Sequence, residues 1–271
     1  TLTRSSAASD VYKRQSLIQA YYEVNPSNNL NPDIYALKGT NALGTSFFVP
    51  FQNYLNNGYP QSPASFDIVA TEDNTTIEIT PRKPIVGHPQ NVTFTITLDA
   101  GETWSGRATS TAASQHPFGT VVNSDKPIAI TISDDSLNGT PYGGCADLFG
   151  DQIVPTEIVG TEYIAIKGNL NGPDKVFFIP TEPNTTISVN GNVVTTLNSL
   201  TSIYTHTLYA NSAFYESSSP VYALHLTGFG CEVGGALLPP IVCTGSQEVA
   251  FIRSTNEFIG LKILVPAGGE D

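Results

Sequence analysis

One nine-residue motif occurs twice in the chain and constrains the fold more than any other feature. Residues 71–79 (TEDNTTIEI) return as residues 181–189 (TEPNTTISV), about 110 positions later. Each copy follows an apolar run, at residues 66–70 or 176–180, and leads into alternating polar and apolar residues. Such alternation indicates a β-strand, and the Asx-type residues before it indicate a turn. Each copy therefore predicts a β-hairpin, and the recurrence predicts a tandem repeat.

Other segments extend this all-β prediction. A proline opens each of the apolar runs at residues 32–39, 127–132 and 220–226, and the first position of a strand tolerates proline because no ladder hydrogen bond is lost there. Glycine and proline total 42 residues (23 + 19), which interrupts most windows long enough for a helix. We expect two tandem β-sandwich-like repeats of roughly 100–115 residues and no substantial helix. A β-propeller-like closure is the alternative, in which the strand at Gly44 would pair outside its own unit.

The repeat also sets the expected domain organisation. Residues 1–15 lack β alternation, and residues 10–15 can be back-translated into the mosaic-end sequence of a transposase-based sequencing adapter. We interpret residues 1–15 as a translated adapter artefact. The expected units are the end of a truncated preceding repeat at residues 16–39, a first repeat at 40–159, a second at 160–247 and the start of a truncated third at 248–271.

Composition narrows the possible functions. Hydrophobic residues make up 40% of the chain, enough for real cores, whereas charged residues make up only 13%. The formal net charge of −12 would repel phosphate backbones, so nucleic acid is not an expected partner. No apolar run approaches the roughly 20 residues that a membrane-spanning helix needs. Methionine is absent, and we therefore expect an internal fragment with flanking domains in the full-length protein.

Six short motifs, each weak alone, follow one another in a specific order. They are NALG at residues 41–44, IVATEDNTT at 68–76, LDAGE at 98–102, DKPIA at 125–129, GDQIVP at 150–155 and GFGCE at 228–232. This ordered set resembles the IgGFc-binding protein N-terminal domain family, in its bacterial surface-protein type, and the resemblance covers about residues 20–268.

The resemblance implies a domain of large secreted or surface proteins. Animal members are mucus proteins named for binding the Fc part of immunoglobulin G, and bacterial members are long surface proteins. No catalytic motif comes with the family. The resulting hypothesis is a non-enzymatic extracellular binding or adhesion module that contacts a protein or glycoprotein of the host or matrix. The alternative is a structural spacer that holds a distal domain away from the cell.

Three cysteines suggest one disulfide. Cys231 and Cys243 bracket a short segment, and an oxidising compartment would favour a bond between them. Closing a loop of that length would stabilise the fold by roughly 2–3 kcal/mol. Cys145 then has no partner in the sequence. The alternative is three reduced, buried thiols.

Four aspartates are the candidate metal ligands. Asp134, Asp135, Asp147 and Asp151 fall within one predicted loop at residues 134–150 and its end, and gathered carboxylates can hold Ca²⁺. The spacing matches no known calcium motif, and capping of turns is the competing interpretation. No other cofactor is expected.

Glu72 and Asp73 could suggest a glycoside hydrolase with paired carboxylates. The second copy of the motif has Pro183 in place of Asp73, so turn formation is the better explanation and no catalytic residue is predicted. We expect the binding surface in the long loops, at residues 53–63 and 134–150, because a spacer would keep its loops short.

Overall fold

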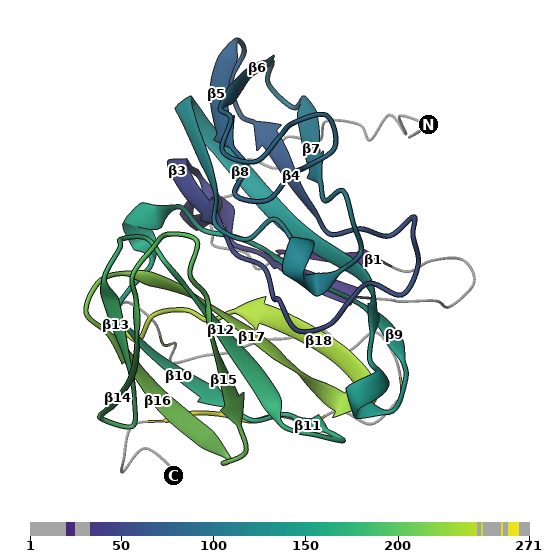
Figure 1. Ribbon diagram of the computed structural model, residues 1–271, viewed down its shortest axis with the longest axis vertical. Helices are drawn as coiled ribbons and strands as arrows, with labels where there is room; N and C mark the ends of the chain where they lie inside the picture. The colour runs from purple at the N-terminus through teal and green to yellow at the C-terminus, as the bar shows by residue number, and fades with distance from the viewer. Residues whose placement is uncertain (1–19, 25–32, 243–244, 246–255, 257–259, 266–271) are drawn as a thin grey trace.

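The computed structural model describes residues 20–24, 33–242, 245, 256 and 260–265 (Figure 1). The predicted adapter segment at residues 1–15 and most of the predicted third repeat at 248–271 lie outside the described residues. The predicted all-β class is confirmed. In the described part of the chain, the helices are four short 3₁₀ turns, namely η1 (Gly39–Ala42), η2 (Ala113–Gln115), η3 (Thr140–Tyr142) and η4 (Thr156–Ile158).

The first unit, β3 to β9, is organised around one long strand, β8. The N-terminal half of β8 pairs with β3 and β5, and its C-terminal half pairs with β4 and β9. With β6 and β7 at its ends, this sheet curls into a nearly closed barrel-like form around a buried core. The strands are β3 (Gly44–Val49), β4 (Ser65–Ala70), β5 (Thr75–Thr80), β6 (Phe94–Leu98), β7 (Thr103–Arg107), β8 (Thr120–Asn138) and β9 (Ala146–Gln152).

The second unit, β10 to β18, is a sandwich of two sheets. One sheet has the order β10-β16-β13-β14, and the other has the order β11-β17-β12-β15, with β18 added to β17. The strands are β10 (Glu162–Ile166), β11 (Asn169–Leu170), β12 (Asp174–Pro180), β13 (Thr185–Val189), β14 (Asn192–Leu197), β15 (Tyr204–Leu208), β16 (Ser212–Ser217), β17 (Val221–Gly230) and β18 (Glu232–Leu237).

The two units have the same strand-pairing pattern. β5 pairs with β6 and the first half of β8, as β13 pairs with β14 and β16. β4 pairs with β7 and the second half of β8, as β12 pairs with β15 and β17. Gly44 lies opposite Ile128 within its own unit, which agrees with sandwich-like closure and not with the propeller alternative. The origin of the units by tandem duplication stays a prediction, and the shared pattern is consistent with it.

The repeated motif forms a corner between two strands that do not pair with each other, so the hairpin prediction is wrong. β4 and β5 do not pair with each other, because each pairs with a different half of β8, and β12 and β13 behave in the same way. Asn74 and Asn184 occupy the left-handed region, with φ of 54° and 62°, where asparagine is tolerated better than most residues. The first copy therefore carries the chain from one side of β8 to the other within the barrel-like sheet, and the second copy carries it from one sheet of the sandwich into the other.

Equivalent hydrogen bonds fix both corners. The hydroxyl of Thr75 donates to the Glu72 carbonyl at 2.7 Å, and that of Thr185 donates to the Glu182 carbonyl at 2.7 Å. The first threonine of each copy donates to the carbonyl of a proline, as Thr71 does to Pro127 and Thr181 to Pro220. Pro220 directly precedes β17, but Pro127 lies within β8, so the prediction that it opens a strand is wrong. The threonines that both copies share therefore form hydrogen bonds that hold the turn.

The sheet that contains β12 and β17 is buried on both faces and joins the units. Val176 and Phe178 pack in the core of the second unit, whereas Phe177 and Ile179 belong to the same buried cluster as first-unit residues such as Phe149. Burying one such large side chain contributes roughly 1.5–3 kcal/mol. Burial on both faces explains why β12 reads as a continuous apolar run and not as an alternating one.

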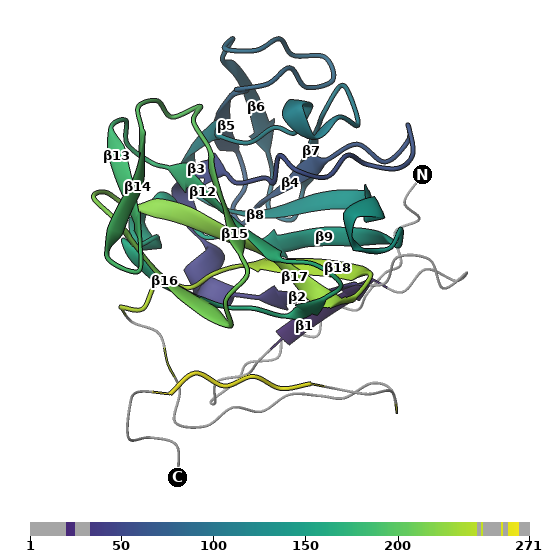
Figure 2. The ribbon, with the colours of Figure 1, turned by 60° about the horizontal axis from the view of Figure 1, so that its bottom comes forward.

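β9 and β18 lie side by side at this junction (Figure 2). The backbone N–H of Val233 donates to Asp147 at 2.7 Å, and that of Leu237 donates to Asp151 at 2.8 Å. Two carboxylates of the first unit therefore satisfy two amides of a strand in the second unit. Because β8 extends to Asn138 and β9 begins at Ala146, the long loop predicted at residues 134–150 is largely a strand pair, and that prediction is wrong.

The segment predicted to end a preceding repeat forms a two-stranded sheet of β1 (Ala20–Val24) and β2 (Asp33–Leu37). The strand predicted at residues 32–39 is β2. This sheet is attached to the first unit just after β2, where the N–H of Lys38 donates to the Gln152 side-chain oxygen at 2.6 Å. Its origin in a truncated repeat stays a prediction.

Substitution of one of two adjacent glycines in β18 will test the junction. A Cβ at Gly235 would overlap the Phe149 ring and come within 2.5 Å of the His225 carbonyl oxygen, whereas a Cβ at Gly234 would meet no atom within 4 Å. We expect Gly235→Ala to lower the free energy of unfolding by at least about 2 kcal/mol, and Gly234→Ala to leave it nearly unchanged. Urea denaturation measures both, and equal effects would contradict the described packing.

Candidate binding surface

The loop at residues 53–63 presents two tyrosines on a fixed base. Tyr54 is 41% exposed and Tyr59 is 53% exposed, while Leu55 and Asn57 between them are buried. The chain thus alternates between side chains that anchor the loop and side chains that face solvent. Tyr54 also reaches the second unit, since the Lys175 ammonium lies 4.5 Å from the centre of its ring. The position of this surface loop agrees with the sequence prediction.

Gln52 closes the first turn of the loop from inside. Its side-chain oxygen accepts hydrogen bonds from the N–H groups of Tyr54 at 2.6 Å and Leu55 at 2.7 Å. Its side-chain nitrogen donates to the Leu55 carbonyl and to Asp134, both at 2.7 Å. Every bond is local or directed to a buried group, so the backbone beneath Tyr54 is held in one conformation.

Asn57 anchors the second half of the loop to β8. Its side-chain nitrogen donates to Asp134 at 2.6 Å and to the Asp135 carbonyl at 2.7 Å. Its side-chain oxygen lies 3.0 Å from Nε2 of His116. The next residue, Gly58, donates its N–H to the Ser136 carbonyl at 2.6 Å. The loop is therefore attached to the irregular part of β8 near Ser136, where φ is +50° and the pairing register with β9 shifts.

His116 completes this buried network, and its geometry favours the protonated ring. Nδ1 lies 3.2 Å from an Asp134 carboxylate oxygen and 3.0 Å from the Gln52 carbonyl, and Nε2 faces the Asn57 oxygen. Both ring nitrogens thus have acceptors, as an imidazolium requires. Burial alone would lower the pKa of His116, but the charge and hydrogen bond of Asp134 and the Gln52 carbonyl outweigh burial and raise the pKa above its ordinary value.

The four aspartates predicted to bind calcium do not form one site. Asp134 belongs to the His116 network, and Asp135 accepts a hydrogen bond from the Ser136 hydroxyl at 3.2 Å. Asp147 and Asp151 are at the junction with β18, where burial raises the pKa of Asp151 and the Lys38 ammonium opposes that rise. The structure gives these carboxylates separate partners, so the predicted calcium site is not assembled from these four side chains.

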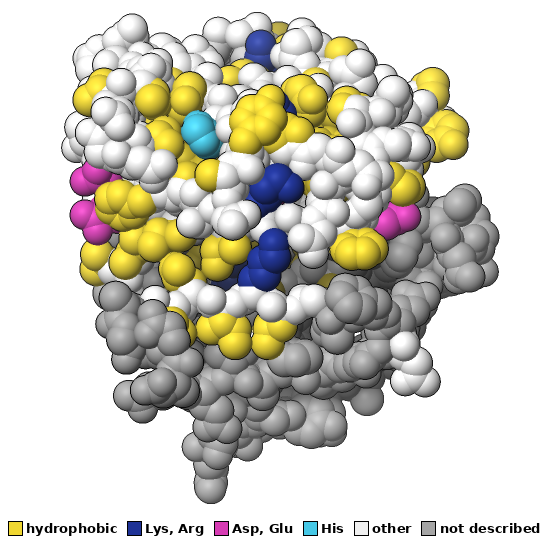
Figure 3. All heavy atoms as spheres, turned by 90° about the horizontal axis from the view of Figure 1, so that it is seen from below, with side chains coloured by type: hydrophobic (Ala, Val, Ile, Leu, Met, Phe, Trp, Pro, Cys, Tyr) yellow, Lys and Arg dark blue, Asp and Glu magenta, His cyan; other side chains and the backbone are white. Residues whose placement is uncertain are grey.

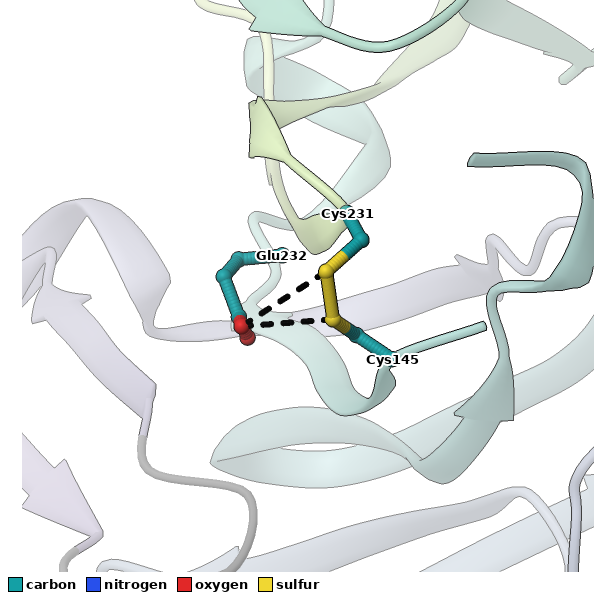
Figure 4. A group of neighbouring side chains, drawn as sticks. All are labelled: Cys145, Cys231 and Glu232. Carbon is teal, nitrogen blue, oxygen red and sulfur yellow. Dashed lines mark hydrogen bonds between the residues drawn. A yellow bond between two sulfur atoms is a disulfide. The ribbon is translucent and has the colours of Figure 1, made fainter. Parts of the chain in front are cut away.

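The disulfide in the structure joins Cys145 to Cys231, with 5.4 Å between their Cα atoms (Figure 4). The predicted bond between Cys231 and Cys243 is therefore wrong in its pairing, and Cys243 lies outside the described residues. Proximity in sequence misled the prediction, because the β8–β9 connection and the β17–β18 turn meet only when the units pack together. The bond adds a covalent link across the junction.

Glu232 lies beside this disulfide, with Oε1 3.3 Å from the Cys145 sulfur and 3.9 Å from the Cys231 sulfur. Three such residues can resemble a metal site. Metal ligation by cysteine requires thiolates, and the disulfide removes both. The arrangement is therefore interpreted as a covalent link and not as a metal centre.

A cavity of about 600 Å³ lies at the junction, between the linker at residues 154–160 and the end of β18. Its walls are mostly apolar. Two of the polar groups at its lining bond within the protein, since the Lys38 ammonium donates to Asp151 and the Tyr222 hydroxyl donates to the Val154 carbonyl at 2.7 Å. Ligand sites usually offer a few convergent polar groups that are free to orient a ligand, so the tyrosine loop is the stronger candidate.

Sequence reasoning located the loop but missed the residues that fix it. Gln52 and Asn57 lie in or beside the loop itself, but His116 and Asp134 come from distant segments, and no motif links the four residues. The one available signal was the Asn, Gly and Pro content of residues 53–63, which indicates a loop and says nothing of its support.

The fold described above is an all-β scaffold that presents a loop held by buried hydrogen bonds. The family model of the IgGFc binding protein matches residues 33–264, and the chain belongs to this family. The family is one of binding domains, typically of extracellular or surface proteins, and is not known for enzymatic activity. Comparison with curated proteins and with solved structures gave no match. No helix in the described part of the chain has the length and hydropathy needed to cross a bilayer.

The stability of the fold should fall as the pH rises through the raised pKa of His116. A group whose pKa is higher in the folded state stabilises below its unfolded pKa of about 6.5, and this contribution is lost at higher pH. We expect the urea midpoint of the wild type to decrease between mildly acidic and mildly alkaline pH more than that of His116→Gln. Identical pH slopes for the two proteins would show that His116 is not the group responsible.

The disulfide pairing can be tested by peptide mapping under non-reducing conditions together with serine substitutions. Loss of a bond that spans 86 residues should cost up to about 4 kcal/mol of unfolding free energy. We expect this loss in Cys145→Ser and in Cys231→Ser, while Cys243→Ser should retain the stability of the wild type. Recovery of a peptide that joins Cys231 to Cys243 would refute the pairing.

Proposed function

We propose that this chain is a non-enzymatic extracellular binding or adhesion module that contacts a protein or glycoprotein ligand through the tyrosine loop, residues 53–63. The observation that carries the proposal is the exposure of Tyr54 and Tyr59 on a loop whose backbone is held by buried hydrogen bonds. Membership of the family supports the binding role. Contact with host or matrix glycoproteins is part of the proposal.

Physical chemistry favours such a loop as a contact surface. Tyrosine offers a large amphipathic ring at low entropic cost, since only two side-chain torsions must be fixed on binding. A loop that is rigid before binding also avoids the cost of being ordered by the ligand. The few charges in this loop suit a contact dominated by rings, hydroxyls and amides, as is typical of binding loops on β-sandwich scaffolds.

The alternative function is a rigid spacer in a surface protein. The observation that favours it is the junction, where a shared buried core and the Cys145–Cys231 bond fix the two units together. A stiff pair of units is what a stalk requires. A spacer gives no physical reason for two exposed tyrosines on a reinforced loop, and we therefore rank binding first.

Removal of each tyrosine ring will test the proposal. Wild-type protein is screened against immobilised immunoglobulin, mucin and matrix proteins, and the affinity of any ligand found is compared with those of Tyr54→Ala and Tyr59→Ala. We expect each variant to bind at least about tenfold more weakly, as loss of a contact residue worth about 1.4 kcal/mol would cause. Far-ultraviolet circular dichroism and the melting temperature check that each variant is folded.

Val193→Ala is the matched control. Val193 is also exposed, at 69%, but it lies on β14, in the four-stranded sheet of the second unit and outside the tyrosine loop. It should bind as the wild type does. Unchanged affinity in both tyrosine variants would place the ligand elsewhere and overturn the role of the loop. Absence of binding to every class of ligand would favour the spacer.

A further inference from the structure

The cavity of about 600 Å³ at the junction has the size of a site for a small organic molecule. Ligand pockets usually measure roughly 300–1,000 Å³ and often occur where folded units meet. The walls come from the chain before β3, the linker at residues 154–160, β10, β17 and the segment that ends β18. They are mostly apolar and include Val154, Ile158, Tyr163, Tyr222, Leu237 and Pro239.

Two tyrosines form fixed parts of these walls. The Tyr163 hydroxyl donates to the Val221 carbonyl at 2.6 Å and accepts a hydrogen bond from the Gly160 N–H at 2.9 Å. The Tyr222 hydroxyl donates to the Val154 carbonyl at 2.7 Å. Both hydroxyl groups are therefore used within the protein, and the rings are held in place before a ligand arrives. A wall that is already ordered avoids the entropic cost of being ordered by the ligand.

Two charged side chains line the cavity, and only one of them is neutralised within the protein. The Lys38 ammonium forms an ion pair with Asp151 and also donates to the Gln152 carbonyl. Glu157, in the short turn η4, is exposed and has no salt-bridge partner among the described residues. The uncompensated charge at the cavity is therefore negative.

The Glu157 carboxylate also acts on the interior of the cavity. Burial raises the pKa of the Tyr222 hydroxyl above its ordinary value, and the negative charge of Glu157 adds to this rise. Asn41 lines the same cavity and offers an amide oxygen. A carboxylate and an amide oxygen both accept hydrogen bonds from N–H groups, so the polar part of the cavity suits a donor that carries positive charge.

We propose that this cavity binds a small amphipathic amine, with the apolar body of the ligand against the tyrosines and its ammonium group beside Glu157. Removal of the apolar body from water supplies affinity. Because Glu157 is exposed, the ammonium keeps part of its hydration and avoids the cost of a fully buried charge. A carboxylate in the same position would be repelled by Glu157, and Lys38 is already paired with Asp151.

This site goes beyond the proposed function, because the tyrosine loop and the cavity are separate. Neither Tyr54 nor Tyr59 lines the cavity, and the ligand is a small molecule and not a protein or glycoprotein. Tyr59→Ala should therefore leave binding of the amine unchanged, and either proposal can fail while the other holds.

Calorimetric titration of the whole chain will test the inference with probes that share one apolar body. They are phenylbutylamine, phenylbutanol and phenylbutyrate, which carry a positive, a neutral and a negative end. We expect the amine to bind about fivefold more tightly than the alcohol, and the carboxylate to bind more weakly than the alcohol. The advantage of the amine should shrink as added salt screens the charges.

The charge of Glu157 must be separated from the general attraction of cations to an acidic protein. The formal net charge is −12, although the face of the molecule seen from below carries acidic side chains toward its borders (Figure 3). We expect Glu157→Gln to reduce the affinity for the amine to about that for the alcohol and to leave binding of the alcohol unchanged. Glu78→Gln on β5 removes the same charge from an exposed residue outside the cavity, and should change the affinity for the amine less than about twofold.

The apolar wall is tested at Ile158, which is 42% exposed and can be shortened with little risk to the fold. Ile158→Ala should weaken binding of every probe by a similar factor, at least about threefold, because each probe loses the same apolar contact. Val86→Ala in the first unit shortens a side chain that is 63% exposed and lies outside the cavity, and should leave the affinities unchanged. Melting temperatures verify that each variant is folded.

The proposal is overturned if the amine shows no saturable binding, or if the amine and the alcohol bind the wild type equally well. It is also overturned if the preference for the amine persists in Glu157→Gln, or if Val86→Ala weakens binding as much as Ile158→Ala does. Tighter binding of the carboxylate than of the amine would contradict it as well, and would assign the polar end of the cavity to Lys38.

Discussion

The burial of one sheet on both of its faces holds this structure together. β12 and β17 give one face to the core of the second unit and the other to the core that begins in the first unit. If the second unit folded without the first, that second face would expose large apolar side chains such as Phe177 and Leu224 to water. The edge of this sheet is completed from the first unit, because Asp147 and Asp151 accept hydrogen bonds from the amides of β18. The two units consequently form one folded body and are not independent domains.

The binding features depend on this junction. Tyr54 belongs to the first unit but lies against Lys175 of the second, and the Thr205 hydroxyl of β15 donates to the Asn53 side chain at 3.3 Å. The tyrosine loop therefore spans the boundary between units, with its own base fixed by Gln52, Asn57 and the His116–Asp134 pair. A rigid junction keeps the loop in a constant position relative to the second unit. The same rigidity would serve a spacer, which is why the two functions share so much of their structural basis.

Local patterns predicted the elements better than their partners. The strands that begin near Gly44 and Pro220, the loop at residues 53–63 and the all-β class could be predicted from alternation and turn residues. The strand at residues 127–132 was also predicted, but as a separate element and not as the middle of β8. The prediction of a hairpin at residues 71–79 was wrong. Alternation indicates that two strands follow each other in the chain, but it does not show that they pair. The Cys145–Cys231 bond and the separation of the four aspartates were also beyond prediction. The disulfide and the partners of Asp147 and Asp151 depend on contacts between segments 86 residues apart, and Asp134 contacts Gln52 across 82 residues.

The recurring motif also separates what local sequence determines from what the tertiary structure determines. By itself the sequence determined that residues 71–79 and 181–189 form turns that enter β-strands, because side-chain hydroxyls of Thr75 and Thr185 bond to backbone only three residues away. It also determined an all-β class and an acidic surface. The tertiary structure alone decided that neither turn closes a hairpin, that β18 meets β9, and that Tyr54 of the first unit lies against Lys175 of the second. Those outcomes follow from shape and burial summed over the whole chain, which no local pattern records.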